Sequence, residues 1–232
     1  MGDIVTMDDL TNQEIVTVLD DAERLVPVAR GDVYLPLLQG KVLANMFFEN
    51  STRTRMSFET AMKRLGGSVL NFTSIGTSVA KGETLYDTMQ MIDGYADVAA
   101  IRHPRQGAAQ YSADAVEIPI LNAGDGAGNH PTQTMLDLFT IRQAHGTLEG
   151  LNVVLVGDLR YGRTVHSLSH ALVRFGAKLT LVSPSTLKMP VEIVSDLREH
   201  GSEIMETDIL EDQIAGAYVI YVTRIQKERF PD

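Results

Sequence analysis

Cysteine is absent from this chain of 232 residues. Its absence excludes disulfide bonds, catalysis by a thiolate and zinc sites built on sulfur. Basic residues are also few, with 20 against 30 acidic ones, and the formal net charge of −10 argues against a general nucleic-acid-binding surface. The arginines must therefore act locally rather than as a basic face.

Long apolar runs are missing as well. No apolar run reaches the roughly 18 residues of a membrane-spanning helix, and Met1-Gly2-Asp3 does not begin a signal peptide. We therefore expect a soluble, cytoplasmic protein. The histidines show no paired metal-ligand spacing, since His166 and His170 lie one helical turn apart but lack a carboxylate partner on that face. We predict no metal site.

What the chain does contain is a regular alternation of predicted strands and helices, with 44% hydrophobic residues to form a core. Such alternation is typical of an α/β fold with parallel sheets. We predict two lobes, each a parallel sheet flanked by helices, with a helix at 132–145 between them. The predicted strands cover 41–48, 68–72, 97–101, 118–121, 151–156, 178–182, 204–206 and 218–223, and the other predicted helices cover 8–26, 54–65, 83–95, 164–175, 191–200 and 210–214.

The most informative segment is the turn after the first predicted strand. It carries hydroxyls on Ser51, Thr52 and Thr54, together with two arginines, Arg53 and Arg55. Backbone N–H groups at a helix start attract anions, and a guanidinium group matches the geometry of a phosphate. Ser51 alone could be an ordinary helix cap and Arg55 could be solvated, but the whole run exceeds what a cap needs. We predict a phosphate-binding turn.

Similar residues follow four other predicted strands, and ligands in open α/β sheets bind beyond the carboxyl ends of the strands. Each has a simpler explanation when taken singly: His130 before Pro131 could be a surface turn, and Arg224 could be a solvated strand end. Five such strand ends together favour a binding site for a polyanion. The four further segments are Arg102-His103-Pro104, Asn122 to Gly126 with His130-Pro131-Thr132-Gln133 after it, Gly157 to Thr164, and Arg224 to Lys227.

Two glycine-rich segments match nucleotide-binding motifs imperfectly. The segment from Gly124 to Gly128 lacks the glycine spacing of the dinucleotide fingerprint. The segment from Gly157 to Thr164 follows the phosphate-loop pattern, but Arg163 replaces the required lysine. A guanidinium cannot place a compact charge between two phosphates, and no later strand ends in an aspartate that would hold magnesium. A nucleotide phosphohydrolase is therefore the weakest hypothesis.

Together these motifs resemble the carbamoyltransferases, and within them the catalytic chains of the aspartate branch. The resemblance covers essentially the whole chain. Ornithine-specific members share the first motif but differ around Lys81 and Arg224. The matching segments are Phe48 to Arg55 with Ser57-Phe58-Glu59, Ser78 to Thr84, Arg102 to Pro104, Asn122 to Gly126, His130 to Gln133, Gly157 to Ser167 and Thr223 to Arg229.

The family implies a reaction in which the amine of L-aspartate attacks carbamoyl phosphate. The products are N-carbamoyl-L-aspartate and phosphate, in an early step of de novo pyrimidine biosynthesis. No cofactor, metal or covalent intermediate is implied. The resemblance also implies domain roles, with carbamoyl phosphate bound by residues 1–133, an interdomain helix and linker at 134–149, and aspartate bound by residues 150–232.

Residue roles follow from the same resemblance. The family's catalytic groups would be Arg53, Thr54, Lys81, Arg102, His130 and Gln133, with Arg102, His130 and Thr54 polarising the carbonyl group and Gln133 orienting the carbamoyl nitrogen. Carbamoyl phosphate would be bound by Ser51, Thr52, Arg53, Thr54, Ser78, Arg102, His130 and Gln133, and aspartate by Lys81, Arg163, Arg224 and Gln226. The loop with Ser78 and Lys81 reaches a neighbouring subunit's site in the family, which implies a homotrimer with shared sites, to which a regulatory chain could bind.

One departure from the family concerns the end of the chain. The family continues after the Arg224 segment through a His-Pro-Leu-Pro loop and a final helix, whereas this sequence ends at Asp232. We therefore expect a C-terminally truncated chain with an incomplete second lobe, and its activity by itself is in question. A second hypothesis is a non-catalytic relative that binds carbamoyl phosphate without turning it over.

Overall fold

The computed structural model describes residues 2–73, 77–126 and 128–225. The chain divides into two compact units, unit 1 (Met1–Thr132) and unit 2 (Gln133–Asp232). The division falls within the first turn of helix α6 (Pro131–His145). None of the helices in the described ranges has both the length and the apolar character needed to cross a membrane.

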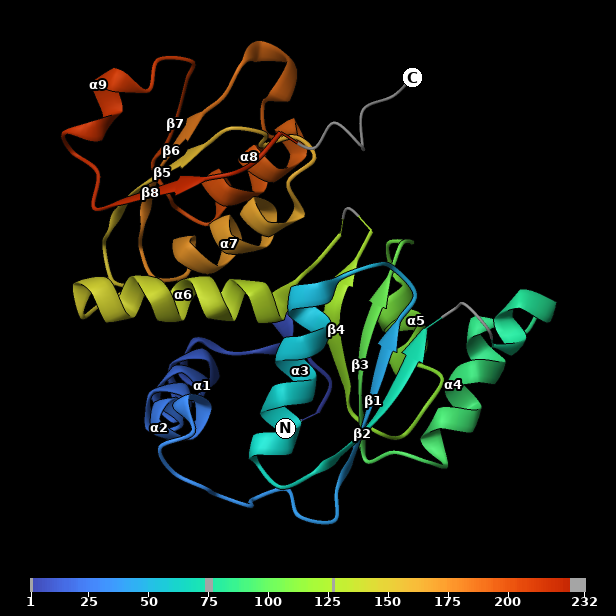
Figure 1. Cartoon of the computed structure of the whole chain (residues 1–232). Helices are drawn as coiled ribbons and strands as arrows, with labels where there is room; N and C mark the ends of the chain where they lie inside the picture. The colour runs from blue at the N-terminus through green and yellow to red at the C-terminus, as the bar shows by residue number, and fades with distance from the viewer. Residues whose placement is uncertain (1, 74–76, 127, 226–232) are drawn as a thin grey trace. The chain divides into compact units, whose positions relative to one another are not determined.

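Unit 1 contains a four-stranded parallel sheet, as predicted (Figure 1). Its strand β1 pairs on both sides, and five of its six residues are buried, as expected for a strand covered on both faces. The strands pair in the order β2 (Ser68–Thr73), β1 (Val42–Phe47), β3 (Val98–His103) and β4 (Ile120–Asp125).

Helices cover both faces of this sheet. One core cluster joins Leu43 of β1 to Met62, and the cluster on the opposite face joins Met46 to Met89. Because alternate residues of a strand point to opposite faces, Asn45 lies on the same face as Leu43. The covering helices are α3 (Thr52–Arg64) on the Leu43 face, and α4 (Leu85–Asp93) and α5 (Ala108–Ala113) on the other.

The helix predicted at 8–26 is confirmed over Asn12–Arg24, but its predicted start and end were wrong. Thr11 begins a new helix, because its hydroxyl accepts the backbone N–H of Glu14 while the Glu14 carboxylate accepts that of Thr11. Pro27 lies in the first turn of the next helix. Helix α5 was not predicted, because its alanine-rich sequence has little apolar periodicity. The N-terminal elements are η1 (Met7–Asp9), α1 (Asn12–Arg24) and α2 (Val26–Arg30).

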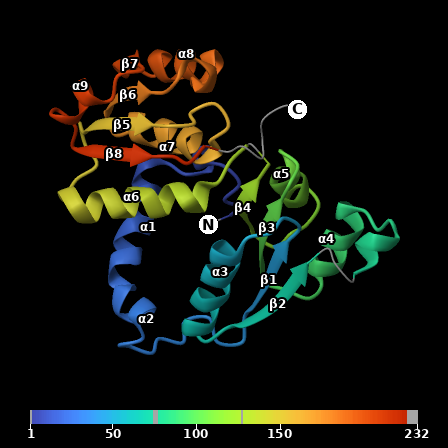
Figure 2. The same ribbon diagram turned by 45° about the horizontal axis from the view of Figure 1, so that its top comes forward.

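Unit 2 contains a second four-stranded parallel sheet, also as predicted. Figure 2 shows its strands with helices α7 and α8 beside them. The strands pair in the order β7 (Ile204–Thr207), β6 (Lys178–Val182), β5 (Asn152–Val156) and β8 (Val219–Val222), and the helices after α6 are α7 (Arg163–Val173), η3 (Ser185–Leu187), α8 (Val191–Glu199) and α9 (Glu211–Ile214).

Candidate active site

The predicted phosphate-binding turn lies at the carboxyl end of β1, where α3 begins. Ser51 occupies the N-cap position of α3, but its side chain makes no capping hydrogen bond within the described residues. The interpretation of Ser51 as an ordinary cap therefore lacks support. Thr52 and Arg53 are exposed and Thr54 is half-buried. The first turn of a 13-residue helix thus presents backbone N–H groups, hydroxyls and a guanidinium group to solvent.

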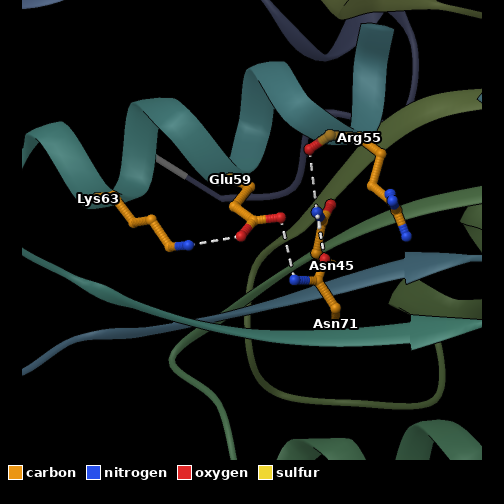
Figure 3. Close-up of polar contacts among 5 residues, drawn as sticks. All are labelled: Asn45, Arg55, Glu59, Lys63 and Asn71. Atoms are coloured by element: carbon orange, nitrogen blue, oxygen red, sulfur yellow. Dashed lines mark hydrogen bonds and ion pairs between the residues drawn. The ribbon is translucent and has the colours of Figure 1, made fainter. Parts of the chain in front are cut away.

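A network of amide and carboxylate groups beneath this turn fixes its position (Figure 3). Asn45 of β1 is completely buried, and its Nδ2 donates to the backbone oxygen of Arg55 and to Asn71 Oδ1, both at 3.1 Å. Asn71 of β2 donates in turn to Glu59 Oε2 at 3.0 Å, and Lys63 pairs with the other oxygen of Glu59. These bonds tie the first turns of α3 to the two strands below it.

Arg102 lies beside the predicted phosphate-binding turn because of the strand register. Phe47 pairs with Arg102 across β1 and β3, and the Phe48 N–H donates to the Arg102 carbonyl at 2.8 Å. The Arg102 side chain is buried; its Nη1 donates to the carbonyl of Ala123 at 3.1 Å, and its Nε lies 3.4 Å from Glu49 Oε2. A buried guanidinium group held by a carbonyl and a carboxylate is a rigid positive group at the ends of three strands.

Asp125 organises the loop that leads from β4 to His130. Its Oδ1 accepts from Asn122 Nδ2 at 3.2 Å and from the Asn129 N–H at 2.8 Å, while its Oδ2 accepts from the Gly107 N–H at 2.9 Å. The Asp125 N–H donates back to the Asn129 carbonyl at 3.2 Å. The residue before His130 is therefore clamped from both sides to a carboxylate that is itself buried.

His130 is buried, with 5% of its surface exposed, so the interpretation of this segment as a surface turn was wrong. It precedes Pro131, the first residue of α6. The hydroxyl of Thr132 lies 3.3 Å from His130 Nδ1 and helps to set the orientation of the ring. His130 and Arg102 both belong to unit 1, where Arg102 lies near the end of β3 and His130 follows the neighbouring strand β4.

His103 lies next to Arg102 at the end of β3, and sequence reasoning identified it only as part of a motif. Its ring lies 5.1 Å from that of Phe48, and its Nδ1 accepts the backbone N–H of Arg105 at 3.0 Å. Burial, followed by the positive charge of Arg105, lowers the pKa of His103 below its ordinary value. Neutral imidazole is thereby favoured at this position.

In unit 2, the segments after β5 and β8 lie side by side. Val156 pairs with Val222, and the Thr223 N–H donates to the Val156 carbonyl at 2.8 Å. Gly157 follows at φ +120°, and a Cβ atom there would lie 2.5 Å from the Thr223 carbonyl oxygen. Only glycine permits this approach, which brings the Gly157 segment next to the segment of Arg224.

Asp158 holds the first part of the Gly157 segment. Its carboxylate is fully buried and accepts the backbone N–H groups of Arg160 at 3.2 Å and Tyr161 at 2.9 Å. Its backbone carbonyl accepts from the Thr223 hydroxyl at 3.2 Å. The segment leads to Arg163, which is buried at the start of α7. Unit 2 therefore places Arg163 and the exposed Arg224 after adjacent strands.

Gln133, at the start of unit 2, lies in the first turn of α6 and donates from Nε2 to Asp137 Oδ1 at 3.0 Å. Tyr221 of β8 donates to Asp137 Oδ2, also at 3.0 Å. Burial raises the pKa of Asp137, while burial and the negative charge of Asp137 raise that of Tyr221. The sequence reasoning did not identify Asp137 or Tyr221.

The other predicted site residues lie on η2 or outside the described residues. Ser78 and Lys81 belong to η2 (Ser78–Lys81) and are exposed. Neither side chain has a hydrogen-bond or ion-pair partner within the part of the chain that the structure describes. Gln226 lies outside the described residues.

His170 does have a carboxylate nearby, Asp196 Oδ2 of α8 at 3.2 Å, but the described ranges contain no group of three or more possible metal ligands.

The supporting residues to which sequence reasoning gave no role have one feature in common: they are polar side chains that form hydrogen bonds to the segments carrying the predicted site residues, or to one another. One signal was available, because asparagine inside the apolar strand β1 is unusual enough to require a hydrogen-bonding role. No spacing pattern pointed to the others, whose partners are distant in the sequence or are backbone groups. The residues outside every predicted site segment are Asn45, Asn71, Asp137 and Tyr221, whereas Asp125 and Asp158 lay within predicted site segments without a role of their own.

Comparison with known families gives two matches that together cover nearly all of the chain. Residues 2–143 match the family described as aspartate/ornithine carbamoyltransferase, carbamoyl-P binding domain. Residues 149–231 match the family described as aspartate/ornithine carbamoyltransferase, Asp/Orn binding domain.

Individual relatives agree with this result. The chain is 53% identical to an aspartate carbamoyltransferase catalytic subunit of Methanothermobacter thermautotrophicus, over 99% of this chain and 74% of that protein. Among solved structures, the catalytic subunit of M. jannaschii aspartate transcarbamoylase has a TM-score of 0.93 at 48% identity, covering 100% of this chain and 76% of the other. Aspartate transcarbamoylase from Trypanosoma cruzi, in complex with carbamoyl phosphate and aspartate, has a TM-score of 0.94 at 42% identity, covering 99% and 74%.

Proposed function

This chain belongs to the aspartate/ornithine carbamoyltransferase family, and we propose that it transfers the carbamoyl group of carbamoyl phosphate to L-aspartate. The products are N-carbamoyl-L-aspartate and phosphate, in an early step of de novo pyrimidine biosynthesis. The observation that carries this proposal is the presence in one chain of a helix start rich in hydroxyl and guanidinium groups in unit 1 and two neighbouring arginine segments in unit 2. The names of the relatives favour aspartate over ornithine as the acceptor.

In this reaction the amine nitrogen of aspartate forms a bond to the carbonyl carbon. The bond from that carbon to the bridging phosphate oxygen breaks, and the amine loses a proton as phosphate departs. The substrates carry several negative charges between them, so the protein must hold two anions that repel each other. Holding both in a reactive geometry can contribute on the order of 7–11 kcal/mol to lowering the barrier.

The start of α3 is the proposed phosphate site. Ser51, Thr52, Arg53 and Thr54 surround the backbone N–H groups of the first turn, and each charge-assisted hydrogen bond would contribute roughly 1.5–3 kcal/mol. Ser78 would contribute from its exposed position on η2. The Asn45 network supports this role, because it leaves the helix start little freedom to move.

Arg102, His130 and Thr54 would polarise the carbonyl group and stabilise the oxyanion of the tetrahedral intermediate. A pre-oriented donor of this kind contributes about 3–4 kcal/mol. The buried, doubly held guanidinium group of Arg102 supports the role, as does the clamped loop before His130. Gln133 would orient the carbamoyl nitrogen.

The two carboxylates of aspartate would be bound by Arg163 and Arg224, whose segments lie after adjacent strands of unit 2. Gln226 and Lys81 are further proposed aspartate ligands. The position of Lys81 on η2, without an ion-pair partner in the described ranges, supports a role in the site of a neighbouring subunit, and hence a homotrimer. A regulatory chain bound to this trimer is also proposed, on the family resemblance alone. A cytoplasmic location is proposed because the reaction joins two soluble, charged metabolites.

The domain roles are also proposals. We assign carbamoyl phosphate binding to residues 1–133 and aspartate binding to residues 150–232, with residues 134–149 as the interdomain helix and linker. The two family matches and the division of the chain into two units support this assignment.

The decisive experiment measures ureido product from carbamoyl phosphate with aspartate and, in parallel, with ornithine. Product with aspartate alone is the expected result. Product with ornithine alone would overturn the assignment of the acceptor. Calorimetric binding of carbamoyl phosphate without any product from either amine would instead favour a non-catalytic relative that binds the same ligand.

A further inference from the structure

Asp137 connects helix α6 to strand β8 within unit 2. It lies one helical turn after Gln133 on α6, and its second oxygen accepts from Tyr221 of β8. Tyr221 precedes Arg224 by three residues. One carboxylate therefore holds the residue proposed to orient the carbamoyl group and the strand that leads to the aspartate-binding arginine.

Burying the Asp137 carboxylate costs desolvation free energy. Burial raises the pKa of Asp137, which shows that its charged form is poorly solvated. A well-packed apolar side chain at such a position is often as stable or more stable. Tyr221 also hydrogen-bonds to Thr164, the second residue of α7. The partly buried carboxylate thus lowers stability, but it fixes the orientation of its two donors, the Gln133 amide and the Tyr221 hydroxyl.

The chemistry of the Gln133–Asp137 contact determines the orientation of the Gln133 amide. An ionised carboxylate only accepts hydrogen bonds, so the amide of Gln133 must turn its NH2 group toward Asp137. The amide oxygen of Gln133 is then the atom on the opposite branch. The NH2 group of a carbamoyl substrate only donates, and it therefore requires an acceptor such as this oxygen.

We propose that Asp137 is a positioning residue that selects the amide orientation of Gln133, so that Gln133 presents its oxygen to the carbamoyl NH2 group. This inference rests on the proposed function. Tyr221 holds the carboxylate from β8, which sets the acceptor for the carbamoyl group in a fixed relation to the strand that leads to Arg224.

The test begins with Asp137→Asn, which keeps the size of the side chain but replaces one acceptor oxygen with a donor group. Gln133 must then compete with Tyr221 for the single oxygen or reverse its amide. We expect kcat for carbamoyl transfer to fall about 10–100-fold, as for a misplacement of the order of 1 Å. The KM for aspartate should change by less than about threefold, because the arginines stay in place.

A double-mutant cycle separates positioning from a general structural role. In a Gln133→Ala background, Asp137→Asn should lower kcat by less than about twofold further, since a residue that acts through Gln133 has nothing left to orient. Tyr221→Phe keeps the contact between Gln133 and Asp137, and it should cost clearly less in kcat than Asp137→Asn. Equal losses from these two variants, or additive losses in the cycle, would overturn the inference.

The matched control is Asp196→Asn, which makes the same change of charge on the partly exposed helix α8 of the same unit. Its kcat should equal that of the unsubstituted chain. If the unsubstituted chain forms no carbamoyl aspartate, the proposed function fails and this inference fails with it. If that chain is active and Asp137→Asn retains full kcat, the inference alone fails.

Discussion

The side-chain amide of Asn45, in the middle of β1, donates to the backbone oxygen of Arg55 in the first turns of α3 at 3.1 Å. Asn45 is completely buried, and the same nitrogen also donates to Asn71 Oδ1. The core strand thus holds the helix whose start is the proposed phosphate site. We therefore expect stability and substrate binding to be coupled at this one side chain.

Replacement of Asn45 should affect both properties. Asn45→Ala removes two hydrogen bonds and leaves a small cavity, and we expect a loss of about 2–3 kcal/mol in the free energy of unfolding. It should also weaken binding of carbamoyl phosphate. Urea denaturation and calorimetric titration measure the two effects. Asn152→Ala, at the exposed start of β5, is the matched control and should lose well under about 1 kcal/mol.

The two proposed anion sites should respond differently to loss of an arginine. Arg53→Ala should lower kcat/KM for carbamoyl phosphate about 10²–10³-fold, because a charged donor to the leaving phosphate is lost. Arg224→Ala should chiefly raise the KM for aspartate, by about 10–100-fold. Arg24→Ala, an exposed arginine of α1, is the control for general charge effects. Unchanged aspartate kinetics in Arg224→Ala would contradict the assignment of the aspartate site.

The glycine between β5 and its following segment should tolerate no side chain. Gly157→Ala places a Cβ atom 2.5 Å from the carbonyl oxygen of Thr223 at φ +120°, so we expect a loss of more than about 2 kcal/mol and a raised KM for aspartate. Gly176→Ala also has a positive φ, but no atom lies within 4 Å of its Cβ. Thermal unfolding should show a smaller loss there, about 1 kcal/mol. Equal losses would show that contact with Thr223 is unimportant.

Stability should depend on pH through His103. Burial lowers the pKa of this histidine in the folded protein, so the unfolded chain binds its proton first as the pH falls. Stability is therefore complete above the ordinary pKa of 6.5 and decreases as the pH is lowered from there to the folded-state pKa. His103→Asn keeps an acceptor atom near the Arg105 N–H and should remove part of this decrease. Urea denaturation between about pH 7 and 5 measures it; parallel curves for the two proteins would refute this account.

Much of the architecture was predictable because the patterns concerned are local. The apolar runs that became β1, β3 and β5 lie buried in parallel sheets, and the hydroxyl and arginine residues after β1 lie at a helix start as expected. The N-terminal helix was misjudged, because the capping box at Thr11 and Glu14 divides a segment that looks continuous by apolar periodicity. The alanine-rich helix α5 has little such periodicity and was missed.

The sequence by itself determined which chemical groups are available: the hydroxyls and arginines at the ends of strands, the histidine before Pro131, and the family whose motifs these are. Only the tertiary structure decided which buried side chains hold those groups in place. Asn45, Asp125 and Asp137 are ordinary polar residues in the sequence, and their roles arise from partners on other elements or on the backbone. The physical reason is burial: once water is excluded, most amide and carboxylate groups pair with other protein groups, and the fold alone determines which one lies within reach.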